Sequence, residues 1–153
     1  MTAEATIKAL NEVASSLGLD PLVFKASTPA EIDAAFNAMA DARADALHVA
    51  PDGFLTSRGP QLITLAARTR IPASSFTSEL VAAGLLMSYG TSLADVFRQV
   101  GVYTGSILKG TKPADLPVLQ STKFEFTLNL QTARTLGIDI PPTLLARADE
   151  VIE

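Results

Sequence analysis

The sequence contains no cysteine, and it has a single histidine, His48, among its 153 residues. Without cysteine, the chain can form neither disulfide bonds nor thiolate metal sites. One histidine makes a catalytic triad or a histidine-rich metal site hard to build. His48 lies between Leu47 and Val49 in an apolar run, where we expect a packed or cross-strand side chain rather than a ligand. We therefore expect no metal and no cofactor.

The motifs of nucleotide-binding and hydrolytic enzymes are also missing. The chain has no glycine-rich phosphate loop, no G-x-G-x-x-G and no G-x-S-x-G elbow. Most carboxylates fall on predicted helix surfaces, and no facing pair suited to acid–base chemistry is evident. These absences disfavour a small α/β enzyme, and we expect a chain that binds rather than catalyses.

Basic residues are few and scattered. Twelve Lys and Arg stand against sixteen Asp and Glu, which gives a net charge of −4. The nearest approach to a basic cluster is Arg68 with Arg70. Nucleic acids and anionic membranes attract clustered Lys and Arg, so we expect neither as a partner.

Long apolar runs are absent as well. The longest candidate, residues 80–87, is far shorter than the roughly 18 residues that a membrane helix needs, so we expect no membrane span. The N-terminus lacks the basic start and the apolar stretch of a signal peptide. We expect a periplasmic location only if the chain is made with such a peptide.

Hydrophobic residues make up 48% of the chain, enough for one core of ordinary size. Their spacing predicts strands and helices that alternate along the chain. Helices are predicted over about 7–17, 28–39, 60–66, 78–83 and 91–109, with a short one ending at Gly137 and a last one opening at Pro141-Pro142. Strands are predicted over 22–24, 46–50, 71–75, 85–88 and 124–130.

This alternation predicts an α/β fold with three layers, in which helices cover both faces of a mainly parallel sheet. Thr28-Pro29-Ala30-Glu31 is the clearest helix start, because Thr28 can accept from the Glu31 amide and Glu31 can reach back. In such sheets, ligands lie beyond the carboxyl ends of the strands. The segments to inspect are therefore 51–54, 74–77 and 88–91.

A resemblance to a known family rests on the second half of the chain. Its motifs are Ala83-Gly84-Leu85-Leu86-Met87-Ser88-Tyr89-Gly90, Ile107-Leu108-Lys109-Gly110, Lys112-Pro113-Ala114-Asp115-Leu116-Pro117, and a closing run from Thr122-Lys123-Phe124-Glu125 to Ile140-Pro141-Pro142. The chain resembles the C-terminal half of ABC transporter substrate-binding proteins with the periplasmic-binding-protein type I fold. It is most similar to the group that binds tryptophan and tyrosine. One departure is Leu85, where the pattern usually has a second glycine.

The resemblance implies a division of the chain. Residues 1–88 and 118–153 would form the second lobe of a two-lobed binder. Residues 89–117 would form the hinge and a helix that packs on the first lobe, which this chain lacks. The strand that normally precedes the opening helix is lacking too.

The resemblance also implies the contacts with a small solute such as an amino acid. Asp52, with Pro51, would face the cleft and could pair with an ammonium group, although Asp between Pro and Gly is equally good turn chemistry. Ser75, Phe76 and Thr77 would follow the next strand, where the ring of Phe76 could stack on a planar ligand or belong to the core. Ser88 and Tyr89 would lie at the hinge, where either could be structural.

The helix predicted at 91–109 carries about seven large apolar side chains that the missing lobe would cover. Leaving each exposed forfeits roughly 1.5–3 kcal/mol. We expect the helix to fold back onto its own lobe or to pack on a second copy, and we favour a homodimer through Phe97, Val100 and Ile107.

Two functions stay open at this point. The first is solute binding for ABC-type import, with the transporter's permease as partner. The alternative is a single-lobe regulatory or protein-interaction domain derived from such a binder, without transport.

Overall fold

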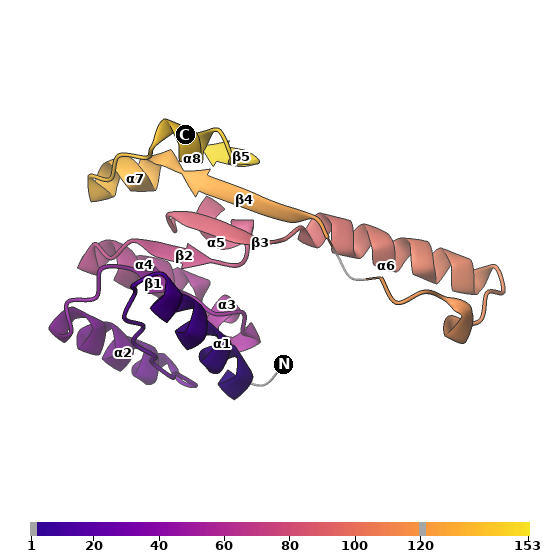
Figure 1. The fold of residues 1–153 in the computed structure, drawn as a ribbon, viewed down its shortest axis with the longest axis horizontal. Helices are drawn as coiled ribbons and strands as arrows, with labels where there is room; N and C mark the ends of the chain where they lie inside the picture. Colours follow the sequence, from indigo (N-terminus) through magenta and orange to yellow (C-terminus); the bar gives the residue numbers. More distant parts are fainter. Residues whose placement is uncertain (1–2, 120–121) are drawn as a thin grey trace. The chain divides into compact units, whose positions relative to one another are not determined.

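The computed structural model describes residues 3–119 and 122–153, and the chain divides into two compact units, Met1–Ala44 and Asp45–Glu153 (Figure 1). Unit 1 contains two helices, α1 (Ala3–Ser16) and α2 (Pro29–Asp41). Gly18 follows α1 with a φ of +70°, the left-handed conformation that favours glycine after a helix. Both helices were predicted from the apolar spacing, and both are confirmed.

The start of α2 has the predicted cap. The Thr28 hydroxyl accepts from the Glu31 amide at 3.3 Å. The Glu31 carboxylate reaches back past the cap and accepts from the amide and the hydroxyl of Ser27, at 2.6 and 2.8 Å. Both bonds lower the pKa of Glu31 because they favour its charged form, and the bond from the Ser27 amide has the larger effect. Ile32, Phe36 and Met39 are buried, as the helical spacing predicted.

The strand predicted over residues 22–24 is wrong. These residues have no regular secondary structure, and Leu22, Val23 and Phe24 are 51%, 42% and 38% exposed. A strand needs a neighbour for its backbone hydrogen bonds, and the five strands that pair in the described chain all belong to unit 2. Local apolar, β-branched composition is therefore not enough to make this segment a strand.

Unit 2 is built on a mixed, mostly parallel sheet of five strands in the order β1-β2-β3-β4-β5. The strands are β1 (Leu47–His48), β2 (Ala73–Ser75), β3 (Met87–Thr91), β4 (Phe124–Asn129) and β5 (Glu150–Ile152). The pairs β1–β2, β2–β3 and β4–β5 are parallel, and β3–β4 is antiparallel. With its flanking helices, this sheet confirms the predicted α/β fold class. β5 was not predicted.

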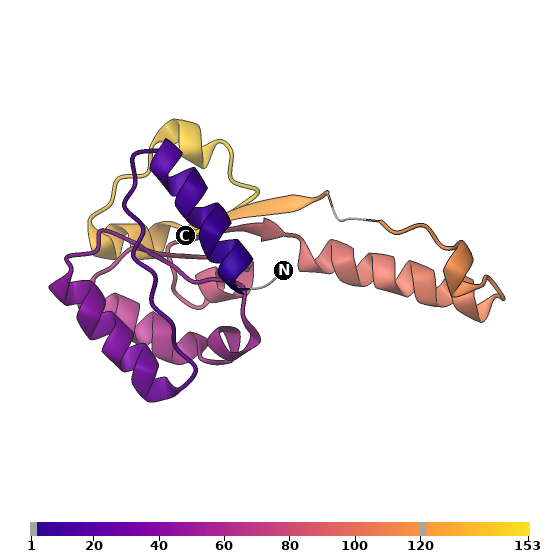
Figure 2. The same cartoon turned by 60° about the horizontal axis from the view of Figure 1, so that its bottom comes forward.

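The helices of unit 2 follow the strands along the chain (Figure 2). They are α3 (Gly53–Ser57), α4 (Gly59–Thr69), α5 (Ser78–Ala82), α6 (Leu93–Leu108), α7 (Leu130–Leu136) and α8 (Pro142–Leu145), with a 3-10 turn at Pro113–Asp115. α7 ends at Gly137, where φ is +72°, as predicted. Helix α3 was not predicted.

Asn129 connects the end of β4 to two helices. Its side-chain nitrogen donates to the carbonyl of Val81 in α5 at 3.0 Å, and its oxygen accepts from the Thr132 amide at the start of α7 at 2.8 Å. Asn129 is 4% exposed, and Val81 and Leu128 beside it are at most 1% exposed. The core of unit 2 therefore lies where α5 packs on β3 and β4.

His48 is a cross-strand residue, which confirms one of the two readings of its position. It lies on the edge strand β1 opposite Ser74 of β2, and its Nδ1 is 2.9 Å from the Ser74 hydroxyl. Partial burial lowers the pKa of His48 because it penalises the charged imidazolium. Within residues 3–119 and 122–153, no three His, Asp or Glu side chains gather into a possible metal site, and no helix is long and apolar enough to cross a membrane.

Candidate functional site

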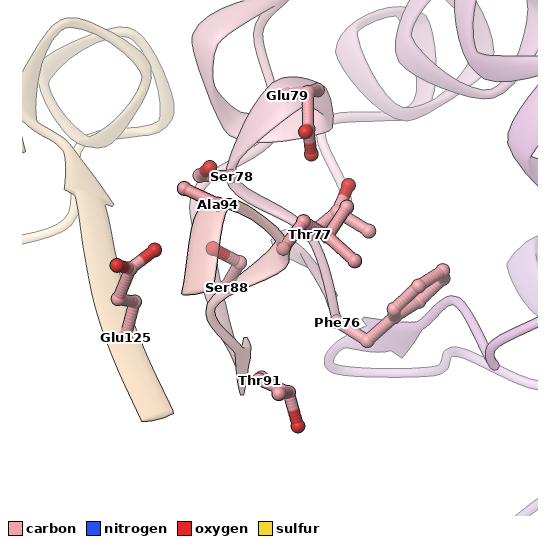
Figure 3. A pocket seen from close by; sticks show the side chains of 10 residues that line it. Phe76, Thr77, Ser78, Glu79, Ser88, Thr91, Ala94 and Glu125 are labelled. Atoms are coloured by element: carbon pink, nitrogen blue, oxygen red, sulfur yellow. The ribbon is translucent and has the colours of Figure 1, made fainter. Parts of the chain in front are cut away.

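A small polar pocket of about 120 Å³ opens at one edge of the sheet in unit 2 (Figure 3). Segments from the loop after β2, the start of α5, β3, the start of α6 and the start of β4 meet there. The lining residues are Phe76, Thr77, Ser78, Glu79, Ser88, Gly90, Thr91, Leu93, Ala94 and Glu125. β2 and β3 run parallel and β4 runs against them, so the pocket lies beyond the carboxyl ends of β2 and β3.

The turn after β2 is held by a buried hydroxyl. Ser75 is 1% exposed, and its Oγ donates to the carbonyl of Thr77 at 2.8 Å. This bond curls the chain so that Phe76 and Thr77 enter the pocket wall before α5 begins. Ser75, a predicted ligand contact, is not among the lining residues; its hydroxyl is engaged within the turn.

Gly90 allows β3 to pass close to that turn. A Cβ added to Gly90 would fall on the carbonyl oxygen of Phe76, far inside van der Waals contact. Only a glycine leaves room for this approach of two backbones. The approach brings the C-terminal end of β3 against the loop after β2, and both segments line the pocket.

The alternation of β3 separates two of the predicted site residues. Successive side chains of a strand point to opposite faces, so Ser88 lines the pocket while Tyr89 does not. Tyr89 stacks instead on Phe124, with ring centroids 5.6 Å apart and planes 12° apart, and it remains 62% exposed. Phe126 meets the same ring edge-on at 6.5 Å.

Asp52 and Pro51 also lie outside the pocket lining. Asp52 caps α3, since its Oδ1 accepts from the Leu55 amide at 3.0 Å. This cap agrees with one of the two roles that the sequence left open for Asp52, a structural role in the turn between Pro and Gly. Of the seven predicted contacts, the pocket brings together three: Phe76, Thr77 and Ser88.

Sequence reasoning did not propose Glu79, Thr91 or Glu125 as site residues. Glu79 could have been found, because it lies in the first turn of the helix that follows a strand end. Glu125 could not, since its position beside the pocket depends on the antiparallel register that sets Gly90 opposite Glu125. That register arises from residues more than thirty positions apart in the chain.

Two buried hydroxyls on this side of the sheet have no hydrogen-bond partner in the described chain. They belong to Thr77, 6% exposed, and Thr127, 1% exposed. Thr77 lines the pocket, whereas Thr127 lies opposite Ser88 inside the sheet. A buried polar group left unpaired costs about 1–3 kcal/mol, so each hydroxyl is a place where a partner would stabilise the protein.

The charged side chains of the lining are both acidic, Glu79 and Glu125. Lys123 lies 3.5 Å from Glu125, but its side chain is 63% exposed, and exposed ion pairs are weak and screened. The start of α6 carries its own anion, Asp95. Hydrogen bonds from Arg98 and then Gln99 lower the pKa of Asp95 by favouring its charged form.

Helix α6 has no buried residue. Figures 1 and 2 both show it leading away from the strands of unit 2. Phe97 is 70% exposed, Val100 55% and Ile107 42%. The Tyr103 hydroxyl donates to the carbonyl of Pro117 in the segment that returns toward β4. The expectation that α6 folds back onto its own lobe is therefore wrong for the isolated chain.

In α/β domains with a mostly parallel sheet, ligands lie beyond the carboxyl ends of the strands, which is where this polar pocket opens. Residues 2–152 match the family of ABC transporter substrate binding proteins, and the chain belongs to that family. This confirms the resemblance seen in the sequence.

Solved structures share the fold of this chain. A conserved domain protein from Vibrio cholerae superposes with a TM-score of 0.86 at 26% identity, covering 97% of this chain and 50% of that one. An ABC domain from Streptococcus pneumoniae in complex with L-Trp gives 0.86 at 27% identity, covering 98% and 52%. A ligand-free, open substrate binding protein with adhesive properties from Clostridium difficile gives 0.69 at 23% identity, covering 98% and 50%. The chain thus spans about half the length of these structures. No curated protein matches the chain.

Proposed function

We propose that this chain is part of the substrate-binding component of an ABC-type uptake transporter, and that it binds a small solute without catalysing a reaction. The observation that carries the proposal is the family match over residues 2–152. The pocket beyond β2 and β3 supplies the place where such a solute would lie.

An amino acid is the favoured solute class. The similar domain from Streptococcus pneumoniae was solved with L-Trp bound. In the present chain, Phe76 lines the pocket and offers a ring for a planar or apolar side chain, and Ser88 offers a hydroxyl. Asp52, Pro51, Ser75 and Tyr89 stay predicted contacts of a ligand held by a larger site.

We propose that the complete site is a cleft between two lobes. The chain covers half of each similar structure, and residues 89–117 would join it to the other half. β3 and β4 form an antiparallel ribbon, from Met87 opposite Leu128 to Thr91 opposite Phe124, that leads out to α6 and back. Two strands crossing between lobes are a suitable hinge for closure on a ligand, and the closed form would be the one that the permease recognises.

Direct binding measurements test the proposal. A thermal-shift panel of aromatic and branched amino acids and small carboxylates should raise the unfolding midpoint for at least one compound, because a ligand bound only by the folded state stabilises it. Phe76→Ala should reduce that shift, while Phe54→Ala, on α3 outside the pocket, should not. If no compound shifts the midpoint, solute binding by this chain is wrong.

The alternative is a single-lobe regulatory or protein-interaction domain without transport. The observation that favours it is the exposed apolar face of α6, which is suited to a protein partner. For the isolated chain, the predicted partner is a second copy, in contact through Phe97, Val100 and Ile107. Upstream coding sequence that encodes a signal peptide and a first lobe in frame would favour transport and a periplasmic location.

A further inference from the structure

We propose that the exposed face of α6 pairs with the same face of a second copy of this chain, with the two helices antiparallel and Gly101 at the two-fold axis. This inference rests on the homodimer proposed above for the isolated chain and deepens it, because it gives the direction and the register of the contact. The same register brings the end of the partner's helix to the rim of the pocket, so that each copy contributes to the other's site.

The spacing of large and small residues along α6 is symmetric about Gly101. Five residues recur at intervals of three and four and therefore share one face of the helix: Ala94, Phe97, Gly101, Gly105 and Leu108. Reversal of the helix about Gly101 exchanges Phe97 with Gly105, and Ala94 with Leu108. In an antiparallel pair, each large side chain therefore meets a small residue of the partner. A parallel pair in register would set ring against ring and leave the glycines unfilled.

This face of α6 is uncovered in the described chain. Phe97 is 70% exposed and Leu108 82%. A Cβ added to Gly101 or to Gly105 would meet nothing within 4 Å apart from the backbone of α6 itself. The distance between two packed helices depends on the side chains at the contact, so a pair of glycines lets the helices approach closely and lets the partner's ring fill the space.

The opposite side of α6 is occupied by the chain itself. The Tyr103 hydroxyl donates to the carbonyl of Pro117 in the segment that returns toward β4. Tyr103 comes two residues after Gly101, which is about 200° around the helix, so the return segment lies away from the glycines. Val100 and Ile107, which are 55% and 42% exposed, border the glycine face and widen the contact with the partner.

Charges favour the antiparallel direction. At the N-terminal end of α6, Asp95, Glu79 and Glu125 outnumber the two cations that contact them. At the C-terminal end, Lys109 and Lys112 outnumber the single acidic residue of the 3-10 turn that follows. An antiparallel pair places these ends against each other and also opposes the two helix dipoles. Exposed charges are screened, so they select the direction of pairing more than its strength.

The register carries the partner to the pocket. Leu93 and Ala94 line the pocket at the start of α6, and Figure 3 shows Ala94 among the lining residues. Because Ala94 pairs with the partner's Leu108, the end of the partner's helix lies at this rim. The leucine of one copy then adds an apolar side chain to the site of the other, which one copy alone does not supply.

Cysteine cross-linking measures the register, because the 153-residue chain has no cysteine of its own. Oxidation of the full chain should give a covalent dimer for Gly101→Cys, since the two-fold axis sets this position against itself. Ala94→Cys chains mixed with Leu108→Cys chains should link to each other, and neither should link to itself. Gly105→Cys alone should stay unlinked, because its own copy in the partner lies eight residues away, about 12 Å along the helix.

Interchange of large and small residues tests the pairing independently. Gly105→Phe places a ring against the partner's Phe97 and should raise the dimer dissociation constant at least about tenfold, as overpacking does. Phe97→Ala should weaken the dimer too. The double variant Phe97→Ala, Gly105→Phe again gives one large and one small residue in each contact and should recover most of the affinity. Val102→Leu enlarges a residue on another side of α6 that is 56% exposed, and it should change nothing. Sedimentation equilibrium measures each protein.

The outcomes separate this register from the homodimer and from solute binding. If Gly105→Cys links to itself as readily as Gly101→Cys, or if the double variant is no better than Gly105→Phe, the antiparallel register is wrong and the homodimer stands. If the mixed Ala94→Cys and Leu108→Cys chains do not link, the partner does not reach the pocket. A chain that stays monomeric at high concentration contradicts the homodimer and the register together, and leaves the first lobe of a longer binding protein as the occupant of this face. Solute binding is measured separately by thermal shift, so its failure contradicts the proposed function without changing the register.

Discussion

The carbonyl oxygen of Phe76 occupies the space that a Cβ on Gly90 would need. This contact joins the end of β2 to the end of β3 through backbone atoms alone. It fixes the distance between the two segments that carry Phe76, Thr77 and Ser88 into the pocket. The shape of the site therefore requires glycine, which has no side chain, at position 90.

Gly90→Ala should therefore destabilise unit 2 by about 1–3 kcal/mol or more, because the backbone of the Phe76 turn must move to admit a methyl group. Urea denaturation followed by circular dichroism measures the loss. Gly101→Ala is the matched control. Its Cβ would meet nothing within 4 Å in the middle of α6, and the gain in helix propensity should stabilise the helix by about 0.5–1 kcal/mol. Equal effects of the two substitutions would contradict the close approach.

Asn129→Ala should cost about 2–3 kcal/mol of unfolding free energy. The substitution leaves the carbonyl of Val81 and the amide of Thr132 without their side-chain partners, and it removes the cap of α7. The same substitution at Asn37, an exposed residue within α2, should cost nothing, since alanine is the better helix former. A loss below about 0.5 kcal/mol at Asn129 would contradict the role assigned to it.

The class of fold was predictable because it depends on local patterns. The apolar spacing around Ile32, Phe36 and Met39 and the cap at Thr28 both act within a few residues, and both are present in the structure. The strand over residues 22–24 was predicted on the same kind of signal and is wrong, because a strand depends on a neighbour as well as on its own composition. A helix forms its backbone hydrogen bonds within its own segment, whereas a strand needs a neighbouring strand. This explains why the helix predictions are confirmed and the prediction of this strand is wrong.

The site was less predictable than the fold. Phe76 and Ser88 follow from the rule that ligands lie beyond strand ends, and both line the pocket. Asp52 satisfied the same rule, yet its carboxylate caps α3. Glu125 was missed because β4 runs antiparallel to β3, so the first residues of β4 reach the side of the sheet where β1, β2 and β3 end. The direction of β4 depends on its pairing with β3, more than thirty residues earlier in the chain, and no short stretch of sequence indicates it.

Thr77→Val should keep or raise the stability of the free protein, by up to about 1 kcal/mol, because it removes a buried hydroxyl that has no partner in the described chain. Ser75→Ala, two residues earlier, is the contrasting variant. It removes a hydroxyl that donates to the Thr77 carbonyl at 2.8 Å, and should destabilise the protein by about 1–2 kcal/mol. Thermal unfolding of both variants checks the pair. A destabilised Thr77→Val protein would show that this hydroxyl has a partner in solution.

Glu31→Gln should lower stability at neutral pH and lose its effect in acid. Hydrogen bonds from Ser27 hold the folded-state pKa of Glu31 below its ordinary value of 4.5. As the pH falls, the unfolded chain therefore takes up this proton first. The stabilisation is complete above about pH 4.5 and is lost as the pH falls through the folded-state pKa. Acid titrations of the two proteins, followed by urea unfolding, should converge at low pH. Glu4→Gln, in the first turn of α1, is the control for a simple change of net charge. Parallel curves at all pH values would contradict the proposed bonds to Ser27.

Helix α6 should decide the oligomeric state of the isolated chain. Phe97, Val100 and Ile107 are 70%, 55% and 42% exposed, and burial of such side chains contributes roughly 1.5–3 kcal/mol each. Light scattering should show a dimer for the unmodified chain and a monomer for the Phe97→Ser, Val100→Ser double variant. The helix keeps its capping bond at Ser92 in both proteins, so circular dichroism should report the same helix content. Arg98→Ser with Gln99→Ser changes the adjacent polar positions and should leave the dimer intact. A monomer for the unmodified chain at high concentration would contradict the homodimer and leave the rest of a longer binding protein as the partner that this face requires.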